Sequence, residues 1–271
     1  MDELHRKQDR LRTILRDMGC AAVAFSAGVD STFLLKTAHD VLGDRVIAVT
    51  AVTGTIPSRE TREAAAFCEA EGVRSVMLSV DVFSVEGFDA NAPDRCYICK
   101  KEILSRITDA AKTYGIPNVI EGSNADDASD YRPGMRAVAE LRVRSPLQEA
   151  GLTKREIRAL SEECGLRTWN KPSFACLATR IAHGERITPE KIARIDRAEQ
   201  LLADLGFRQY RVRVQGETAR IELPPEEISR FLAPELREKV RACVHQLGFR
   251  YVSLDLDGYR TGSMNPAPEQ P

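Results

Sequence analysis

Between residues 20 and 123, short apolar runs alternate with stretches of helical periodicity, and this alternation limits the possible folds more than any other feature of the chain. Four apolar runs predict buried strands, at 20–25, 45–52, 73–80 and 118–123. The periodic stretches between and after them predict helices, at 31–43, 58–72, 100–115 and 152–165. Strands separated by helices of this length pair in parallel, because each crossover returns the chain to the same end of the sheet. We therefore expect an α/β fold built on a parallel sheet.

The pattern changes after about residue 184. A helix is expected at 188–206, with Pro189 in its first turn, and strict alternation at 209–223 predicts a hairpin that turns at Gly216 and Glu217. Two more helices and a last strand are expected, at 225–232, 234–247 and 250–256. We thus divide the chain into an α/β domain at 1–184, a small α+β domain at 185–265 and a tail at 266–271 that is expected to be disordered.

Composition excludes several classes of protein. The chain has 271 residues, 43% of them hydrophobic, and no apolar run long enough to span a membrane. Its charged N-terminus lacks the apolar core of a signal peptide, so we expect a cytoplasmic protein. The net charge of −1 gives no electrostatic reason to expect a nucleic-acid partner. In a reducing compartment cysteines are thiols, ligands or catalysts, and we expect four of the seven to be buried thiols, namely Cys20, Cys68, Cys164 and Cys243.

The stretch FSAGVDST, at residues 25–32, lies where the first expected strand meets the first expected helix. Ligands of open α/β sheets bind outside the carboxyl ends of the strands. Small side chains at Ser26, Ala27 and Gly28 let a ligand approach the backbone, and free N–H groups at the helix start can hold an anion. The stretch has neither the lysine of a P-loop nor the G-x-G-x-x-G spacing of a dinucleotide site. The alternative interpretation is a capped helix after a tight turn.

The same residues resemble the S-G-G-x-D-S loop of N-type ATP pyrophosphatases, with Ala27 at the second position. Enzymes with this loop cleave ATP between the α- and β-phosphates to adenylylate an oxygen. The resemblance implies that the phosphates are held by Ser26, Gly28, Asp30 and Ser31. The end of the second strand, at Thr50 and Ala51, is then expected to lie against the adenine because of the strand order.

Two further stretches carry residues suited to metals. Cys96 and Cys99 form a Cys-x-x-Cys pair, which fits half a zinc site, a redox pair, part of an iron–sulfur site or two buried thiols. Three acidic residues follow the fourth expected strand, Asp126, Asp127 and Asp130. Carboxylates at an ATP site can hold magnesium, although the spacing alone favours a solvated loop with Asx turns.

A third stretch, WNKPSFACLATRI at 169–181, has no helical period and contains Cys176 four residues before Arg180. A nearby cation favours the thiolate, which is a better nucleophile and metal ligand than the thiol. Composition alone favours the alternative, a buried cysteine in an interdomain linker.

These stretches, in this order and with the closing LDLDGYRTGSMN, resemble the LarE family from about residue 10 to residue 265. The resemblance implies an ATP-dependent sulfur transferase that adenylylates and thiolates the carboxylates of pyridinium-3,5-biscarboxylic acid mononucleotide. The product of this family leads to the nickel-pincer nucleotide cofactor of lactate racemase. The resemblance further implies that Cys176 delivers the sulfur and that the protein is a homo-oligomer. It suggests partners among sulfide donors and the proteins that mature lactate racemase.

The family has two variants, which differ at the cysteines. In one variant the delivering cysteine gives up its own sulfur, and in the other a Cys-x-x-Cys pair joins it on a [4Fe–4S] cluster. Because this chain has Cys96, Cys99 and Cys176, the resemblance implies the cluster variant, whose fourth iron has no protein ligand and can carry the transferred sulfide. Zinc held by three cysteines and a water is an alternative, but it does not explain sulfur delivery.

The expected hairpin places Arg213 opposite Arg220 and Arg211 opposite Glu222, on the side away from an apolar face. Like charges directly opposite destabilise a hairpin unless an anion lies between them. The phosphate of a nucleotide substrate is one candidate anion, with four arginines as its expected ligands, Arg180, Arg211, Arg213 and Arg220. A solvated face with splayed arginines and a subunit contact are the alternatives.

Three other functions compete with sulfur transfer to a small nucleotide. A tRNA thiolase shares the ATP loop, but it predicts a basic RNA-binding surface that a net charge of −1 disfavours. An amide-forming synthetase leaves Cys176 and the cysteine pair unexplained. A non-catalytic nucleotide-binding or iron–sulfur carrier would not convert ATP to AMP and pyrophosphate.

Overall fold

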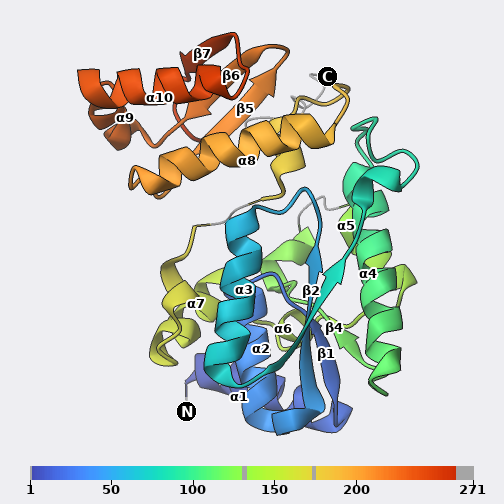
Figure 1. Cartoon of the computed structure of the whole chain (residues 1–271). Helices are drawn as coiled ribbons and strands as arrows, with labels where there is room; N and C mark the ends of the chain where they lie inside the picture. The colour runs from blue at the N-terminus through green and yellow to red at the C-terminus, as the bar shows by residue number, and fades with distance from the viewer. Residues whose placement is uncertain (1, 130–132, 173–174, 261–271) are drawn as a thin grey trace, which may run out of the picture. The chain divides into compact units, whose positions relative to one another are not determined.

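The computed structural model describes residues 2–129, 133–172 and 175–260. The chain divides into two compact units, and each unit consists of two separate segments of the sequence (Figure 1). The first unit comprises Met1–Val85 and Asp94–Phe174, and the second comprises Glu86–Pro93 and Ala175–Pro271. The tail expected at 266–271 lies outside the described residues.

The first unit is built on a parallel sheet with the strand order β3–β2–β1–β4 (Figure 1). Its strands are β1 (Ala21–Ala24), β2 (Val46–Val52), β3 (Arg74–Ser79) and β4 (Val119–Ile120). Small and β-branched apolar residues fill β1 and β2, as expected for strands that are buried on both faces. The predicted α/β class and all four predicted strands are confirmed, although β4 has only two residues.

Helices cover both faces of this sheet. One face carries α1 (Glu3–Met18), α2 (Val29–Leu42), α3 (Ser58–Glu71), α6 (Pro146–Glu149) and α7 (Lys154–Glu163), and the other carries α4 (Arg95–Thr113) and α5 (Gly134–Glu140). Because side chains alternate along a strand, Val23 of β1 packs with the first group of helices and Ala22 packs with the second. Strands β1, β2 and β4 therefore each contribute to two separate hydrophobic clusters.

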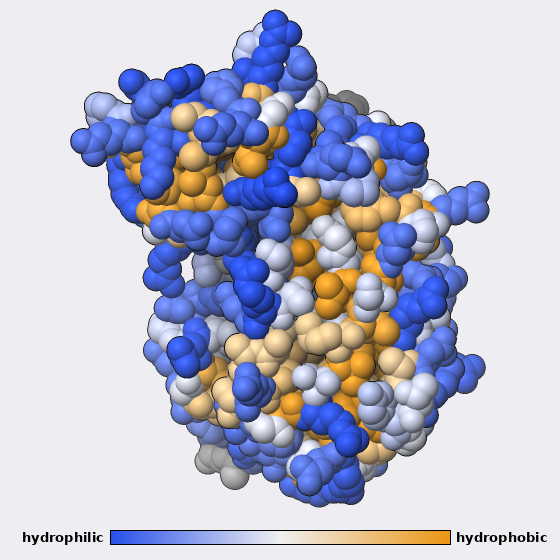
Figure 2. Space-filling model, viewed as in Figure 1, coloured by the Kyte–Doolittle hydropathy of each residue, from blue (hydrophilic) through white to orange (hydrophobic). Residues whose placement is uncertain are grey.

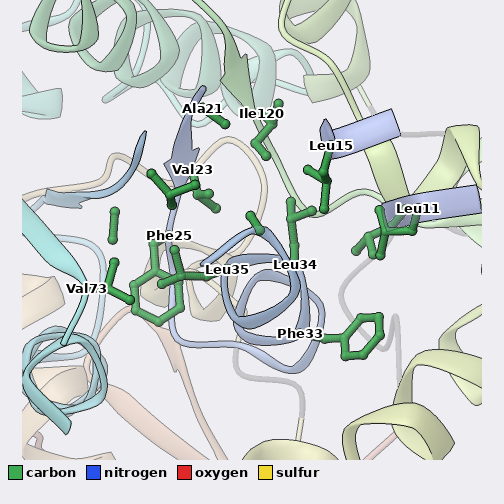
Figure 3. Packing of buried hydrophobic residues seen from close by; sticks show 14 of the residues in the cluster. Leu11, Leu15, Ala21, Val23, Phe25, Phe33, Leu34, Leu35, Val73 and Ile120 are labelled. Carbon is green, nitrogen blue, oxygen red and sulfur yellow. The ribbon is translucent and has the colours of Figure 1, made fainter. Parts of the chain in front are cut away.

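The larger cluster lies between the sheet and α2 (Figure 3). Leu34 of α2 lies beside Leu15 of α1, and Leu35 lies beside Phe25 at the end of β1 (Figure 3). These four side chains are at most 3% exposed. Burying a side chain of this size contributes about 1.5–3 kcal/mol. The cluster therefore anchors the start of α2, which the FSAGVDST stretch leads into, against the sheet.

Several helices of the first unit differ from the prediction. Helix α4 begins at Arg95 rather than at residue 100, so the Cys-x-x-Cys pair lies in its first turn. Helices α1, α5 and α6 were not predicted; in α1 the charged residues obscure a buried stripe that includes Leu11 and Leu15. The capping box that opens α7 is present, with reciprocal hydrogen bonds between Thr153 and Glu156.

In the second unit, the described residues form three strands in the order β5–β6–β7 and three α-helices. Strands β5 (Arg211–Gln215) and β6 (Thr218–Glu222) form the predicted hairpin in the predicted register, and β7 (Tyr251–Leu254) pairs in parallel with β6. The helices are α8 (Pro189–Asp204), α9 (Pro225–Phe231) and α10 (Pro234–Gln246). All three lie where the sequence predicts helices.

The division between the units differs from the boundary expected near residue 184. The stretch from Ala175 onward belongs to the second unit, and so do residues 86–93. Asn91 is fully buried there, and its Nδ2 donates to the carbonyl oxygens of Ile181 (3.3 Å), Ala182 (2.7 Å) and Glu185 (3.1 Å). Contacts between segments about ninety residues apart leave no periodic signal in the sequence, which explains why the prediction missed them.

The surface of the first unit is uneven in polarity. In Figure 2, apolar surface gathers over the middle of this unit, over the strands that Figure 1 shows between α3 and α4. Within the described residues, no helix is long and apolar enough to cross a membrane. Of the four cysteines expected to be buried only Cys68 is, whereas Cys164 is exposed because it lies just beyond the last turn of α7.

Candidate active site

A cavity of about 360 Å³ opens at the carboxyl ends of β1, β2 and β4 in the first unit. All six residues expected to contact ATP line it, namely Ser26, Gly28, Asp30, Ser31, Thr50 and Ala51. Apolar side chains of α4, including Ile103 and Ile107, form another wall. The cavity thus combines a polar loop with an apolar wall, as sites for nucleotides do.

The loop at residues 25–31, which we call the phosphate-binding loop after the ATP pyrophosphatase loops that it resembles, leads into α2 without a side-chain cap. The helix begins at Val29, two residues earlier than predicted, with Gly28 as its N-cap. The Ser31 hydroxyl donates to the Gly28 carbonyl (3.3 Å) and lies 3.0 Å from the Ser26 hydroxyl. The first N–H groups of an α-helix have no partner within the helix and carry the positive end of its dipole. The loop is therefore suited to hold an anion such as a phosphate.

Ala27 has a left-handed backbone with φ 55°. This is the position at which the similar loops of N-type ATP pyrophosphatases carry glycine. An alanine in this conformation costs about 1–2 kcal/mol, because its Cβ crowds the following carbonyl. The loop thus has a backbone conformation that glycine adopts readily, but with an alanine at this position.

Gly122, which the sequence analysis missed, lies directly behind the loop. A Cβ on this residue would lie 3.0 Å from the Ser31 nitrogen and 3.2 Å from the Ser31 Cα. Both atoms belong to the backbone of α2, which cannot move aside as a flexible side chain can. Gly122 therefore lets the end of β4 approach the phosphate-binding loop closely.

Lys100 and Glu121 form an ion pair on the cavity wall that the sequence did not reveal. The Lys100 ammonium donates to Glu121 Oε2 at 3.1 Å, and Ser145 Oγ and Ser123 N donate to Glu121 Oε1 at 2.5 and 3.0 Å. Burial alone would raise the pKa of Glu121, but Lys100 and these hydrogen bonds together hold it below its usual value. Glu121 therefore stays a carboxylate at the cavity wall, with Lys100 as its ion-pair partner.

Asp30 is the acidic residue at the start of α2. It pairs with the Lys154 ammonium, while its Oδ1 is buried and has no hydrogen-bond partner among the described residues. A carboxylate oxygen left in this state at a phosphate-binding loop fits a magnesium ligand, because magnesium takes one or two carboxylates and keeps waters and phosphate oxygens as its other ligands. Lys154 carries no sequence signal beyond its place at the start of a helix.

Asp126 and Asp127 are already engaged with backbone N–H groups. Asp127 lines the cavity and its Oδ2 accepts from the Asn124 nitrogen at 2.9 Å, while Asp126 Oδ2 accepts from the Lys154 nitrogen at 2.8 Å. Asp130 lies outside the described residues. Within those residues, no group of three or more His, Cys, Asp or Glu side chains is placed to hold a metal ion. The arrangement matches the turn interpretation of this loop more closely than the magnesium interpretation.

Cys96 and Cys99 lie three residues apart in the first turn of α4, on one face of the helix. Cys96 is exposed and Cys99 is half-buried. The Arg95 guanidinium approaches the Cys96 sulfur at 3.7 Å. Two accessible thiols on one helical turn, one of them beside a cation, fit the donor set of a thiolate-bound metal group.

Cys176 belongs to the second unit and precedes a short 3-10 helix at Leu177–Arg180. Its carbonyl oxygen accepts from the Thr179 nitrogen (3.0 Å), the Thr179 hydroxyl (2.8 Å) and Arg180 Nη1 (3.2 Å). Leu177 and Ala178 are buried, whereas the Cys176 side chain is half-buried. The backbone of the cysteine is therefore fixed while its thiol stays accessible.

Arg180 contacts the backbone around Cys176 and not the thiol, contrary to the expectation. Its guanidinium is fully buried, donates to both carboxylate oxygens of Glu199 (2.8 and 3.0 Å), and also donates to the Ala175 carbonyl (2.8 Å). Burying a guanidinium requires such partners, because its desolvation is costly. A substrate phosphate at Arg180 would have to compete with Glu199.

The hairpin arginines are neutralised by the protein itself. Glu222 is fully buried, and its carboxylate lies 2.9 Å from Arg213 and 3.4 Å from Arg220, which also approaches Asp255 at 3.5 Å. The anion that the predicted register required between Arg213 and Arg220 is therefore Glu222, and the solvated-face alternative does not describe Arg213, which is 5% exposed. Glu222 lies opposite Arg211, as predicted, but its carboxylate pairs with Arg213 at the diagonal position on β5 and with Arg220 two residues earlier on β6.

Arg211 is also buried, 4.9 Å from the ring of Tyr259. Burial, together with repulsion from Arg180 and Arg213, lowers the pKa of Arg211 to about 10. Strand β5 is thus buried on both faces, which a simple alternation of apolar and charged residues did not indicate.

Comparison with known proteins places this geometry in a family. No protein-family model matches the chain. The chain is 40% identical over 266 residues to the pyridinium-3,5-bisthiocarboxylic acid mononucleotide synthase of Lactiplantibacillus plantarum, covering 98% of this chain and 96% of the relative. It is also 40% identical to an uncharacterised protein of Synechocystis, covering 97% of this chain and 98% of the relative.

The chain is also similar, at lower identity, to enzymes with other names. A chain of the glutamine-hydrolysing GMP synthase of Thermoplasma acidophilum is 29% identical over 69% of this chain and 64% of the relative. This similarity fits the parallel sheet and the phosphate-binding loop at the end of β1. From the near-complete coverage at 40% identity, we conclude that the chain belongs to the LarE family of ATP-dependent sulfurtransferases.

Proposed function

We propose that the protein uses ATP to convert a carboxylate of pyridinium-3,5-biscarboxylic acid mononucleotide into a thiocarboxylate, in the pathway to the nickel-pincer nucleotide cofactor. The observation that carries the proposal is the cavity, which is lined by every residue of the loop expected to bind ATP, in a chain similar along its length to a synthase of the bisthiocarboxylic product. A carboxylate does not react with sulfur nucleophiles until one of its oxygens becomes a leaving group.

The reaction proceeds in two substitutions. A substrate carboxylate oxygen attacks the α-phosphorus of ATP, the bond to the β-phosphate oxygen breaks, and pyrophosphate leaves with the bonding electrons. A sulfur nucleophile then adds to the activated carbonyl carbon, and AMP leaves with the oxygen that it gained. The N–H groups at the start of α2 and the hydroxyls of Ser26 and Ser31 would bind the phosphates, and Thr50 and Ala51 would contact the adenine. Magnesium at Asp30 Oδ1 would neutralise part of the triphosphate charge.

For sulfur delivery we propose Cys176, with Cys96 and Cys99 as further ligands of a [4Fe–4S] cluster. Such a cluster on three thiolates leaves one iron open to carry a sulfide. The proposal is supported by the accessible pair in the first turn of α4 and by the turn that fixes the backbone of Cys176. The alternative is that Cys176 gives up its own sulfur.

Replacement of single cysteines tests this assignment. After anaerobic purification, Cys96→Ala, Cys99→Ala and Cys176→Ala are each expected to lose most of the iron and all sulfur transfer. Cys164→Ala is the matched control, because Cys164 is exposed and has no part in the proposed site, so it should keep both. Loss of the mass of hydrogen sulfide from Cys176 in iron-loaded protein after one turnover would contradict delivery from the cluster.

The ATP assignment is tested by pyrophosphate release. Asp30→Ala is expected to abolish it, because the substitution removes the carboxylate at the start of α2 whose Oδ1 is buried and has no hydrogen-bond partner among the described residues. Asp40→Ala is the control on the same helix, where Asp40 pairs with Lys36 at the exposed end. Full pyrophosphate release by Asp30→Ala would remove Asp30 from the site.

We also propose that the protein works in the cytoplasm as a homo-oligomer, with sulfide donors and proteins of lactate racemase maturation as partners. None of the seven cysteines forms a disulfide, which is usual in a reducing compartment. Tyr251 and Leu256 of the second unit are large apolar residues that are 54% and 87% exposed, as residues at a contact between copies can be in a single chain. Light scattering after size-exclusion chromatography tests the assembly, and a monomer would contradict it.

A further inference from the structure

Lys171, which neither lines the cavity nor belongs to the expected site, contacts the phosphate-binding loop from outside. Its ammonium donates to the Ala27 carbonyl (3.0 Å), Glu60 Oε2 (2.7 Å) and Glu63 Oε2 (2.5 Å). The side chain is 13% exposed. Each of the three N–H groups of the ammonium thus has an acceptor. Because two acceptors belong to α3 and one to the loop, Lys171 joins the loop to α3.

The backbone of Lys171 is held as firmly as its side chain. Arg158 of α7 donates from Nη2 to the Lys171 carbonyl (2.9 Å) and from Nη1 to the Trp169 carbonyl (2.5 Å). Lys171 is therefore anchored at one end by α7 and at the other by α3 and the loop. An ammonium on such a support can hold the Ala27 carbonyl in a fixed direction.

The contact falls on the residue of the loop that most needs support. Ala27 has φ 55°, a conformation in which a residue with a side chain persists only where its surroundings enforce it. A hydrogen bond from a charged donor is stronger than one from a neutral donor. Lys171 makes such a bond to the carbonyl of Ala27 itself.

We propose that Lys171 is a positioning residue that keeps the phosphate-binding loop in its left-handed shape and so supports ATP binding without contacting ATP. The alanine in the loop makes this support necessary, because a glycine would adopt the same backbone without strain. The inference rests on the proposed use of ATP at this loop, and it adds a residue to which no role has been assigned.

Glu60 completes the arrangement by holding the ammonium in place, whereas Glu63 adds an exposed ion pair. Glu60 lines the cavity and is 9% exposed, and its carboxylate keeps Lys171 directed toward the loop. Glu63 is 52% exposed and lies on the outer side. The two carboxylates therefore differ: Glu63 can be changed with little effect on the loop, while Glu60 borders the site itself.

A double-mutant comparison in the full-length protein tests the proposal. The probe is α,β-methylene-ATP with magnesium, measured by calorimetry, with KM and kcat for ATP in pyrophosphate release as a second readout. Lys171→Met should weaken binding about tenfold, which corresponds to about 1.4 kcal/mol, and should raise KM for ATP more than it lowers kcat. Ala27→Gly alone should stay within about twofold of the wild type, and Ala27→Gly with Lys171→Met should return to within about threefold, because glycine no longer needs the support.

Glu63→Gln is the matched control, since it removes one ion pair of Lys171 and leaves the bond to Ala27, so binding should not change. If Lys171→Met does not fold, as judged by circular dichroism and the urea midpoint, Lys171→Gln takes its place in the same comparison. A double variant as weak as Lys171→Met alone would overturn the proposal, as would unchanged binding in Lys171→Met. A wild-type protein that neither binds the analogue nor releases pyrophosphate would overturn the proposed function, and this inference with it.

Discussion

The phosphate-binding loop and the turn that carries Cys176 are both small loops before helices, but they are stabilised in opposite ways. The loop presents backbone N–H groups and hydroxyls, and its ion pair of Asp30 with Lys154 has side chains that are 22% and 35% exposed. The Cys176 turn is held by Arg180 and Glu199, whose side chains are completely buried. The first region can exchange its partners for a ligand, whereas the second is fixed in one arrangement.

The difference fits the roles that we propose for the two regions. A loop that binds a triphosphate and releases pyrophosphate gains from ion pairs that are weak in water, typically worth about 0–1 kcal/mol when exposed. A cysteine that must meet a separate substrate gains from a backbone that does not move. A buried ion pair enforces one geometry even where its net contribution to stability is small, because either partner left alone is strongly destabilising.

The largest expected effect follows from breaking the buried pair. Glu199→Ala and Arg180→Ala should each lower the free energy of unfolding by about 3–5 kcal/mol, because the remaining charge stays buried without its partner. Urea unfolding measures this loss. Arg241→Ala, which removes an exposed pair with Glu238 in the same unit, should change stability little. Equal effects of the three variants would erase the contrast between the two regions.

A smaller effect is expected behind the phosphate-binding loop. Gly122→Ala places a Cβ against the backbone of Ser31, and overpacking of this kind costs about 1–3 kcal/mol. Because the displaced backbone is the start of α2, the cost should fall on ATP binding as well as on stability. Calorimetry with an ATP analogue and urea unfolding separate the two. Unchanged ATP affinity in Gly122→Ala would contradict the expectation that a displaced Ser31 backbone weakens ATP binding.

A still smaller effect on stability is expected from the helix caps, which differ between α8 and α2. Thr188 caps α8, which carries Glu199, by accepting from the Lys191 nitrogen at 3.3 Å, whereas α2 begins at Gly28 without such a bond. Thr188→Ala should lower the free energy of unfolding by about 1 kcal/mol, since the first turn of α8 then loses an acceptor. The midpoint of thermal unfolding reports the change. Stability equal to that of the wild type would mean that α8 depends on its buried face alone.

The last expected effect, which is confined to alkaline pH, concerns a thiol in the core of the first unit. Burial raises the pKa of Cys68 to about 11 from a usual value of 9.0, so the folded protein favours the neutral thiol. The stability that this preference gives is complete below pH 9 and declines as pH rises toward 11. The stability difference between wild type and Cys68→Ala should therefore shrink between pH 8 and pH 10.5. A difference that does not change with pH would place the Cys68 thiol in contact with water.

Most strands and helices of the first unit could be predicted from the sequence, because each produces a local periodicity of apolar residues. Four residues of the loop that were predicted to bind ATP, Ser26, Gly28, Asp30 and Ser31, line the cavity, because the stretch falls at the end of a predicted strand. Gly122, Lys100 and Lys171 were missed because each matters only through contacts with residues distant in sequence. No local pattern reports such contacts.

In the second unit, the hairpin register was predicted correctly and its burial was not. Alternating valines and arginines in β5 indicated one apolar face and one charged face, which was predicted to hold an anion, to be solvated or to contact another subunit. The structure buries Arg211 and Arg213 as well, because Glu222 and the Cys176 turn supply partners for charges on that face. Which charged residues are buried depends on tertiary pairing, and periodicity carries no information about it.

The insertion of residues 86–93 into the second unit also bears on how the chain is made. Asn91 donates to the carbonyl of Ala182, ninety-one residues later in the sequence. At a synthesis rate of about 5–20 residues per second, the ribosome needs roughly 5–20 s to produce that partner. During this interval most strands of the first unit have already been synthesised. Residues 86–93, however, still lack the part of the second unit against which they pack. A nascent chain stalled between the two segments should therefore expose Phe88 and Asn91, which makes this stage the point at which a chaperone would be most useful.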